Sequence, residues 1–133
     1  MSAVNGLRRW HEVMAGGNRP EDLAALIHED AVFHSPVVHT AQEGRALVVA
    51  YLAAAGQTLG NDSFTYVREM IDGPNAMLEF ETCLEGIHVN GVDIIRFDEN
   101  AMITDFKVMV RPLKALHKVW ELMAAELDRA APR

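Results

Sequence analysis

Apolar residues in the first part of the chain recur at helical spacing. Four of them, at intervals of three and four positions, predict a first helix that a glycine pair at positions 16–17 ends: Val4, Leu7, Trp10 and Met14. Further helices are expected to open at Pro20, to span residues 44–59 and to open at Pro112, and a short strand is expected over residues 31–36. The N-terminal part is therefore predicted to be mainly helical.

Polar and apolar residues alternate between residues 64 and 111, which is typical of strands. Four strands are expected, over residues 64–71, 76–89, 92–97 and 102–111. The turns between them fall on "DGPN", on Asn90-Gly91 and on "DENA". Asn-Gly is the strongest two-residue hairpin signal. Helices, then an antiparallel meander, then a helix indicate an α+β domain whose helices cover one face of a curved sheet.

A hairpin turn at Asn90-Gly91 determines which residues face each other across the two central strands. Asp93 would lie directly opposite His88. The face that carries this pair is otherwise apolar, and it is the face that the helices should cover: Phe80, Leu84, Ile95 and Phe97. Asp93 is then either an acid or base tuned by burial in a pocket, or one half of a His88–Asp93 pair near a solvated hairpin tip.

The composition excludes several classes of protein. The chain has 133 residues, half of them hydrophobic, which is enough for one domain with one sizeable core. The formal charge of −7 makes a nucleic-acid partner unexpected. No apolar run approaches the roughly 20 residues that span a bilayer, and no signal peptide is apparent. The lone cysteine, Cys83, suits a reducing cytoplasm.

Three longer stretches together resemble a known family. They are "RWHEVMAGGNRPEDLAALIHEDAVFHSP", "EGRALVVAYL" and "VDIIRFDENAMITDFKVMV", and the similarity runs from Leu7 to Arg111. The chain resembles the SnoaL-like and ketosteroid-isomerase-like branch of the nuclear transport factor 2-like superfamily. The resemblance implies a single domain over residues 1–133 with a cone-shaped (cystatin-like) fold. In it a strongly bent antiparallel sheet, wrapped on N-terminal helices and followed by a C-terminal helix, encloses one apolar cavity.

The isomerase pattern is only partly present in this chain. The position of the general base, before the strand-ending proline, is Ser35, and the position of the tyrosine donor on the first helix is Trp10. The second donor of the pattern, a protonated aspartate, corresponds to Asp93. Trp10 can donate through its indole N–H or serve simply as core. The resemblance and the expected strand register together predict the cavity wall: Trp10, Met14, Phe33, Ser35, Tyr51, Phe80, Leu84, His88, Asp93, Phe106, Val108 and Val110.

These observations lead to one main functional hypothesis and two alternatives. The main hypothesis is an isomerase, cyclase or lyase that needs no cofactor and acts on a small apolar molecule. Asp93 would be its acid or base and His88 the partner of Asp93, while Trp10, Ser35 and Tyr51 orient the substrate. The alternatives are a non-catalytic ligand-binding protein and a dimeric interaction module with a filled cone. A homodimer is expected, and no metal site, because the spacing of His28, His34 and His39 matches no standard ligand pattern.

Overall fold

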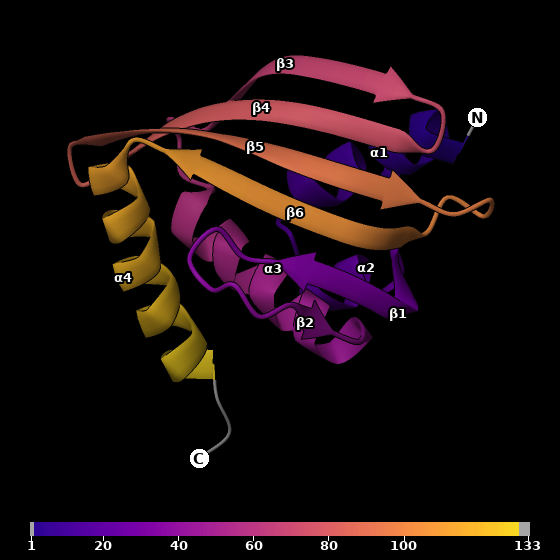
Figure 1. Cartoon of the computed structure of the whole chain (residues 1–133), viewed down its shortest axis with the longest axis horizontal. Helices are drawn as coiled ribbons and strands as arrows, with labels where there is room; N and C mark the ends of the chain where they lie inside the picture. Colours follow the sequence, from indigo (N-terminus) through magenta and orange to yellow (C-terminus); the bar gives the residue numbers. More distant parts are fainter. Residues whose placement is uncertain (1, 131–133) are drawn as a thin grey trace.

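The computed structural model describes residues 2–130, which form four helices around one six-stranded sheet (Figure 1). The helices are α1 (Ser2–Ala15), α2 (Pro20–Ala24), α3 (Arg45–Leu59) and α4 (Leu113–Ala130). The strands are β1 (Ile27–His34), β2 (Gln42–Glu43), β3 (Thr65–Asp72), β4 (Asn75–Leu84), β5 (Ile87–Phe97) and β6 (Ile103–Arg111). Helices α1 to α3 lie on one side of the sheet, and α4 crosses one end of it (Figure 1).

The order of strands across the sheet is β2-β1-β6-β5-β4-β3. Strands β3 to β6 form the antiparallel meander that the alternation predicts. The strand β1 lies parallel to β6, so the sheet is mixed at that edge. The α+β class, the curved sheet, the N-terminal helices and the C-terminal helix are confirmed.

The hairpin between β4 and β5 turns at Glu85-Gly86, so the predicted turn at Asn90-Gly91 is wrong. Leu84 pairs with Ile87, and both residues of the turn have positive φ, 50° and 83°. Positive φ at both central residues is the geometry of a type I′ turn, whose twist suits a hairpin. β4 therefore ends five residues earlier than the position of Asn90-Gly91 suggested.

Asn90-Gly91 lies inside β5, where the glycine has a packing role. Gly91 pairs with Phe80, and a Cβ atom added to it would lie 2.3 Å from Cζ of the phenylalanine ring. Only a residue without a side chain lets the ring lie across the strand at this point. The Asn90 side chain donates to the Phe80 carbonyl oxygen and to a Glu79 carboxylate oxygen, each at 3.0 Å.

The different position of the turn leaves Asp93 on the predicted inner face of the sheet but gives it a different cross-strand partner. Asp93 pairs with Leu78 on β4 and with Val108 on β6, all three buried. His88 belongs to β5 and pairs with Cys83 on the exposed outer face. The predicted pairing of His88 with Asp93 is therefore wrong. Asp93 remains on the inner face with Ile95 and Phe97 because the true register differs from the predicted one by an even number of positions.

Candidate functional site

A cavity of about 540 Å³ lies between the inner face of the sheet and helices α1, α3 and α4. This volume is in the range of small-molecule sites. Most of its wall is aromatic or aliphatic: Trp10, Met14, Phe33, Leu52, Leu59, Phe64, Tyr66, Phe80, Phe106, Val108, Val110, Val119 and Met123. Its polar side chains are His11, Asn18, Ser35, Gln57, Asn61 and Asp93. An apolar wall with few polar groups suits a compound that is mostly hydrocarbon.

Asp93 is the one acidic side chain that the sheet brings into this wall within residues 2–130. It is 7% exposed, and its carboxyl group makes no hydrogen bond to any side chain or backbone group of residues 2–130. Burial disfavours the charged form and raises the pKa of Asp93 to about 8. The group is therefore mostly a neutral carboxylic acid at pH 7, and a neutral acid can donate a hydrogen bond to a ligand oxygen.

A second donor, Tyr66 on β3, lies in the same wall. The indole Nε1–H of Trp10 donates to the Tyr66 hydroxyl oxygen at 3.1 Å. Burial, and then the nearby Asp93 charge, raise the pKa of Tyr66 above its ordinary value, so the phenol stays protonated. An indole N–H cannot accept, so the tyrosine proton is left for another acceptor. Trp10 thereby orients Tyr66 and is also a part of the core.

Ring contacts hold this wall together. Phe106 lies 5.1 Å from Trp10 and 6.0 Å from Phe33, measured between ring centroids. On the opposite side, Phe64 lies 5.0 Å from Tyr66 and 5.2 Å from Phe80. Such pairs stabilise by about 0.5–1.5 kcal/mol each beyond the area that they bury. The Tyr66 ring is therefore packed within a cluster of aromatic side chains.

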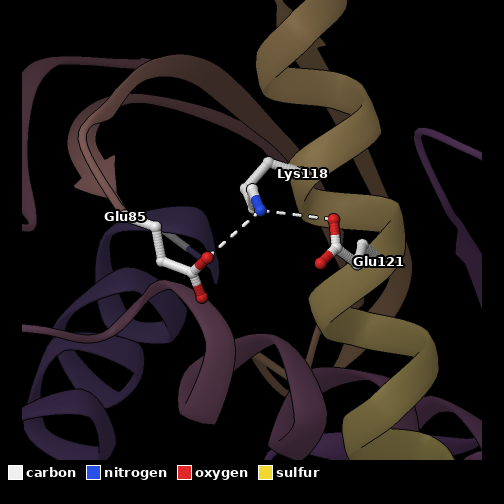
Figure 2. A network of polar contacts seen from close by, with 3 residues as sticks. All are labelled: Glu85, Lys118 and Glu121. Carbon is white, nitrogen blue, oxygen red and sulfur yellow. Dashed lines mark hydrogen bonds and ion pairs between the residues drawn. The ribbon is translucent and has the colours of Figure 1, made fainter.

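Helices α3 and α4 complete the cavity in different ways. α3 contributes the small residues Ala55 and Gly56, and the glycine makes room for the Asn18 side chain, whereas α4 contributes Val119 and Met123. Lys118 of α4 reaches the β4–β5 turn, where Nζ donates to Glu85 at 3.1 Å, and it also donates to Glu121 at 3.2 Å (Figure 2). These hydrogen bonds raise the pKa of Lys118 above its ordinary value. The contacts tie α4 to the hairpin beside the cavity.

The predicted wall residues are placed as follows. Nine of them line the cavity: Trp10, Met14, Phe33, Ser35, Phe80, Asp93, Phe106, Val108 and Val110. Leu84 and Tyr51 lie outside the wall. Leu84 is buried near the end of β4, and Tyr51 packs against Phe33 from α3, with ring centroids 5.4 Å apart. His88 is exposed. Whether the nine residues contact a ligand stays a prediction.

The sequence did not predict two cavity residues whose side chains can donate or transfer a proton, His11 and Tyr66. His11 follows Trp10 on α1, and Tyr66 follows Phe64 at the strand period of two. Because residues two positions apart share a face of a strand, an inward Phe64 would have predicted an inward Tyr66. The signal for His11 is weak, because its hydrogen-bond partner Glu69 is 58 positions away in the sequence.

Other groups of polar side chains form structural contacts. Ser35 Oγ accepts from the Val37 backbone N–H at 3.2 Å, which places this hydroxyl in a local turn. His34 Nε2 lies 2.9 Å from Asp105 Oδ1 on the neighbouring strand. Among residues 2–130, no three histidine, cysteine or acidic side chains gather as a metal site would need. None of the helices in that range combines the length and hydrophobicity required to cross a bilayer.

Comparison with known proteins identifies the family. Residues 7–106 match the family model of the SnoaL-like domain. A steroid delta-isomerase from Pseudomonas aeruginosa shares 35% sequence identity, with a TM-score of 0.89 over 96% of this chain and 93% of that chain. A protein from Silicibacter pomeroyi with a cystatin-like fold shares 32% identity, with a TM-score of 0.82 over 90% and 83% of the two chains.

A more distant structure shares the fold alone. It is a nuclear transport factor 2-like protein from Mesorhizobium loti, 20% identical, with a TM-score of 0.70 over 84% of this chain and 92% of that chain. No curated protein matches the chain. The match to the family model covers most of the chain and agrees with the resemblance seen in the sequence. The chain belongs to the SnoaL-like family, within the nuclear transport factor 2-like fold.

Proposed function

We propose that the protein is a cofactor-independent enzyme of the isomerase, cyclase or lyase type, acting on a small and largely apolar compound that carries a carbonyl oxygen. The observation that carries this proposal is Asp93, a buried carboxyl group that faces an apolar cavity without a hydrogen-bond partner among residues 2–130, and burial raises its pKa to about 8. An unpaired buried donor is costly to the fold, and a ligand oxygen would satisfy it.

Asp93 and Tyr66 would act together on that oxygen. Both are O–H donors at pH 7, and both lie in a wall that is mostly apolar. Negative charge develops on a carbonyl oxygen when a proton leaves a neighbouring carbon. Donors that already point at that oxygen stabilise the charge without having to reorganise. The steroid delta-isomerase at 35% identity supports a fused-ring ketone as the first substrate class to test.

A binding assay tests the two donors. The probe is 2-naphthol, an apolar aromatic molecule with one oxygen, titrated by fluorescence. Asp93→Leu and Tyr66→Phe, which each remove a donor, should each weaken its binding about tenfold, the expected loss for one hydrogen bond to a buried group. His88→Gln is the control, since this residue lies outside the cavity, and its affinity should match the wild type. Equal affinity in all four proteins would overturn the assignment of the donors.

Turnover separates the enzyme from the alternative, a non-catalytic binding protein. That alternative is favoured by Ser35, which stands at the position of the isomerase base, because serine is a poor proton abstractor and its hydroxyl is engaged in a local turn. The test reaction is the isomerisation of 5-androstene-3,17-dione, followed by the ultraviolet absorbance of the conjugated product. The enzyme should convert it, and Asp93→Leu, which removes the donor, should abolish conversion without unfolding. Tight 2-naphthol binding without any turnover would favour the binding protein.

We also propose that the protein forms a homodimer through the outer face of the sheet. Apolar side chains gather on this face across four strands: Met70, Met77, Val92, Ile94 and Met109. Met70 and Met109 are 46% and 49% exposed, and an exposed apolar patch of this kind is typical of an interaction site. Light scattering should give a dimer for the wild type and a monomer for Met109→Lys. An unchanged dimer in the variant would exclude this face.

A further inference from the structure

We propose that His11, oriented by Glu69, is a catalytic residue that moves a proton between two carbon atoms of the bound ketone. This inference rests on the proposed function, because it needs the ligand oxygen to be held by Asp93 and Tyr66. It supplies the proton-transfer group that the site otherwise lacks. His11 lines the cavity, and its Nε2 lies 2.8 Å from Glu69 Oε1. Its Nδ1 has no hydrogen-bond partner among residues 2–130.

An irregularity in β3 brings Glu69 to this position. Tyr66 pairs with Phe80 and Arg68 pairs with Glu79, so Val67 is an extra residue between them. This is a β-bulge, a feature that re-aims side chains and is common beside active sites. Beyond the bulge, Glu69 pairs with Leu78, whose side chain is fully buried on the inner face. Tyr66 and Glu69 therefore both turn toward the side of the sheet that α1 covers.

The carboxylate determines which nitrogen of His11 faces the substrate. A histidine Nε2–H donates to the carboxylate oxygen, and the neutral ring then keeps its lone pair on Nδ1. The His11 ring meets the Tyr66 ring edge-on, with centroids 5.3 Å apart. A ketone oxygen bound by the tyrosine hydroxyl would place the neighbouring carbons beside the imidazole. Glu69 is thus a positioning residue, and His11 contacts the substrate.

The proposed step is a proton shift with no net change in charge. His11 Nδ1 takes the proton from the carbon next to the carbonyl, and the electron pair of that C–H bond forms the double bond of an enolate. The enolate oxygen accepts hydrogen bonds from Asp93 and Tyr66 while it is negative. The imidazolium then returns the proton to the far carbon of the conjugated system. The double bond has moved, and His11 is neutral again.

One experiment measures steady-state kinetics with 5-androstene-3,17-dione. A second uses a smaller ketone, 2-tetralone, and follows the exchange of its protons in D2O by NMR. His11→Gln should lower kcat about 100-fold or more, as expected for loss of an acid–base group, with KM within about twofold. Its affinity for 2-naphthol should be unchanged, because Asp93 and Tyr66 remain. His88→Gln is the matched control and should behave like the wild type.

The role of Glu69 has its own readout. Glu69→Gln should lower kcat about tenfold with little change in KM, the size expected when the orienting partner of a histidine is lost. Glu69→Asp should restore part of that loss. If Glu69 had a purely structural role, its replacement would lower the melting temperature instead. Little change in stability is expected, because the side chains of His11 and Glu69 are both more than a third exposed.

Three results would overturn the inference and can be told apart. If His11→Gln turns over as fast as His88→Gln while Asp93→Leu is inactive, His11 is excluded and the proposed function remains. Wild-type protein that binds 2-naphthol but neither isomerises nor exchanges either ketone excludes the proton shift and leaves ligand binding. Wild-type protein that neither binds nor reacts excludes both proposals.

Discussion

The indole N–H of Trp10 donates to the hydroxyl oxygen of Tyr66 across 3.1 Å, which joins α1 to β3 at the cavity wall. Tyr66→Phe should destabilise the fold by about 1–2 kcal/mol, because it leaves a buried donor without its acceptor. In a double-mutant cycle with Trp10→Phe, urea denaturation should give a coupling energy of about 1 kcal/mol. A coupling near zero would mean that the contact contributes nothing to stability.

Asp93 should make the stability of the protein depend on pH. Its pKa is about 8 in the folded protein, against an ordinary value of 3.8. The folded protein therefore holds a proton that the unfolded chain releases between these two values. The free energy of unfolding should fall as the pH rises through this window, by up to about 1.4 kcal/mol per pH unit, and level off above it.

The variant Asp93→Asn isolates this effect, because the amide does not titrate and all other groups are shared. The difference in unfolding free energy between variant and wild type should grow in favour of the variant from about pH 5 to about pH 8. Urea denaturation at steps across that range measures it. Parallel pH profiles for the two proteins would show that the Asp93 pKa is not raised.

Gly91 should be intolerant of any side chain while Phe80 is present. A Cβ atom at position 91 would lie 2.3 Å from Cζ of the Phe80 ring, so Gly91→Ala should cost about 1–3 kcal/mol of stability. In a Phe80→Leu background, the same change should cost less than about 0.5 kcal/mol, because the shorter side chain no longer reaches the strand. Thermal denaturation of the four proteins tests this. Equal costs in both backgrounds would contradict the packing argument.

Glu85 is a position at which the protein can be stabilised. It adopts φ 50° in the β4–β5 turn, where Asn is favoured over Glu. Glu85→Asn should raise the free energy of unfolding by about 0.5–1 kcal/mol through relief of the left-handed backbone. Glu85→Gln is the control: it removes the charge that faces Lys118 but keeps the strain. If both variants lose stability equally, the contact with Lys118 outweighs the turn.

The inward facing of Asp93 could be predicted from the sequence because strand alternation has a period of two. Moving the turn from Asn90-Gly91 to Glu85-Gly86 preserves that alternation. The neighbour of Asp93 could not be predicted in the same way. The Asn-Gly signal is local, whereas the need for Gly91 arises from the Phe80 ring on the adjacent strand, and this tertiary contact outweighed the turn preference.

The rest of the site depends on how elements that are far apart in the sequence dock. His11 enters the cavity wall because α1 lies against β3, and the bulge at Val67 interrupts the alternation that would have signalled Glu69. Strand alternation places Leu84 on the inner face of the sheet, which predicts a place in the cavity wall. It lies near the end of β4, however, away from the cavity. Tyr51 has helical spacing typical of an inward residue, yet its ring packs against Phe33.

The extra residue in β3 determines the sign of the charge that lies beside His11. If the strand paired without it, regular alternation from Tyr66 would bring Arg68 to the inner face in place of Glu69. A guanidinium there would attract carboxylates and phosphates, which the Glu69 carboxylate repels. The turn at Gly73-Pro74, at the far end of the same hairpin, sets this pairing. A change in turn length would therefore exchange Glu69 for Arg68 beside His11 and favour anions over neutral molecules, although the residues that line the cavity stay the same.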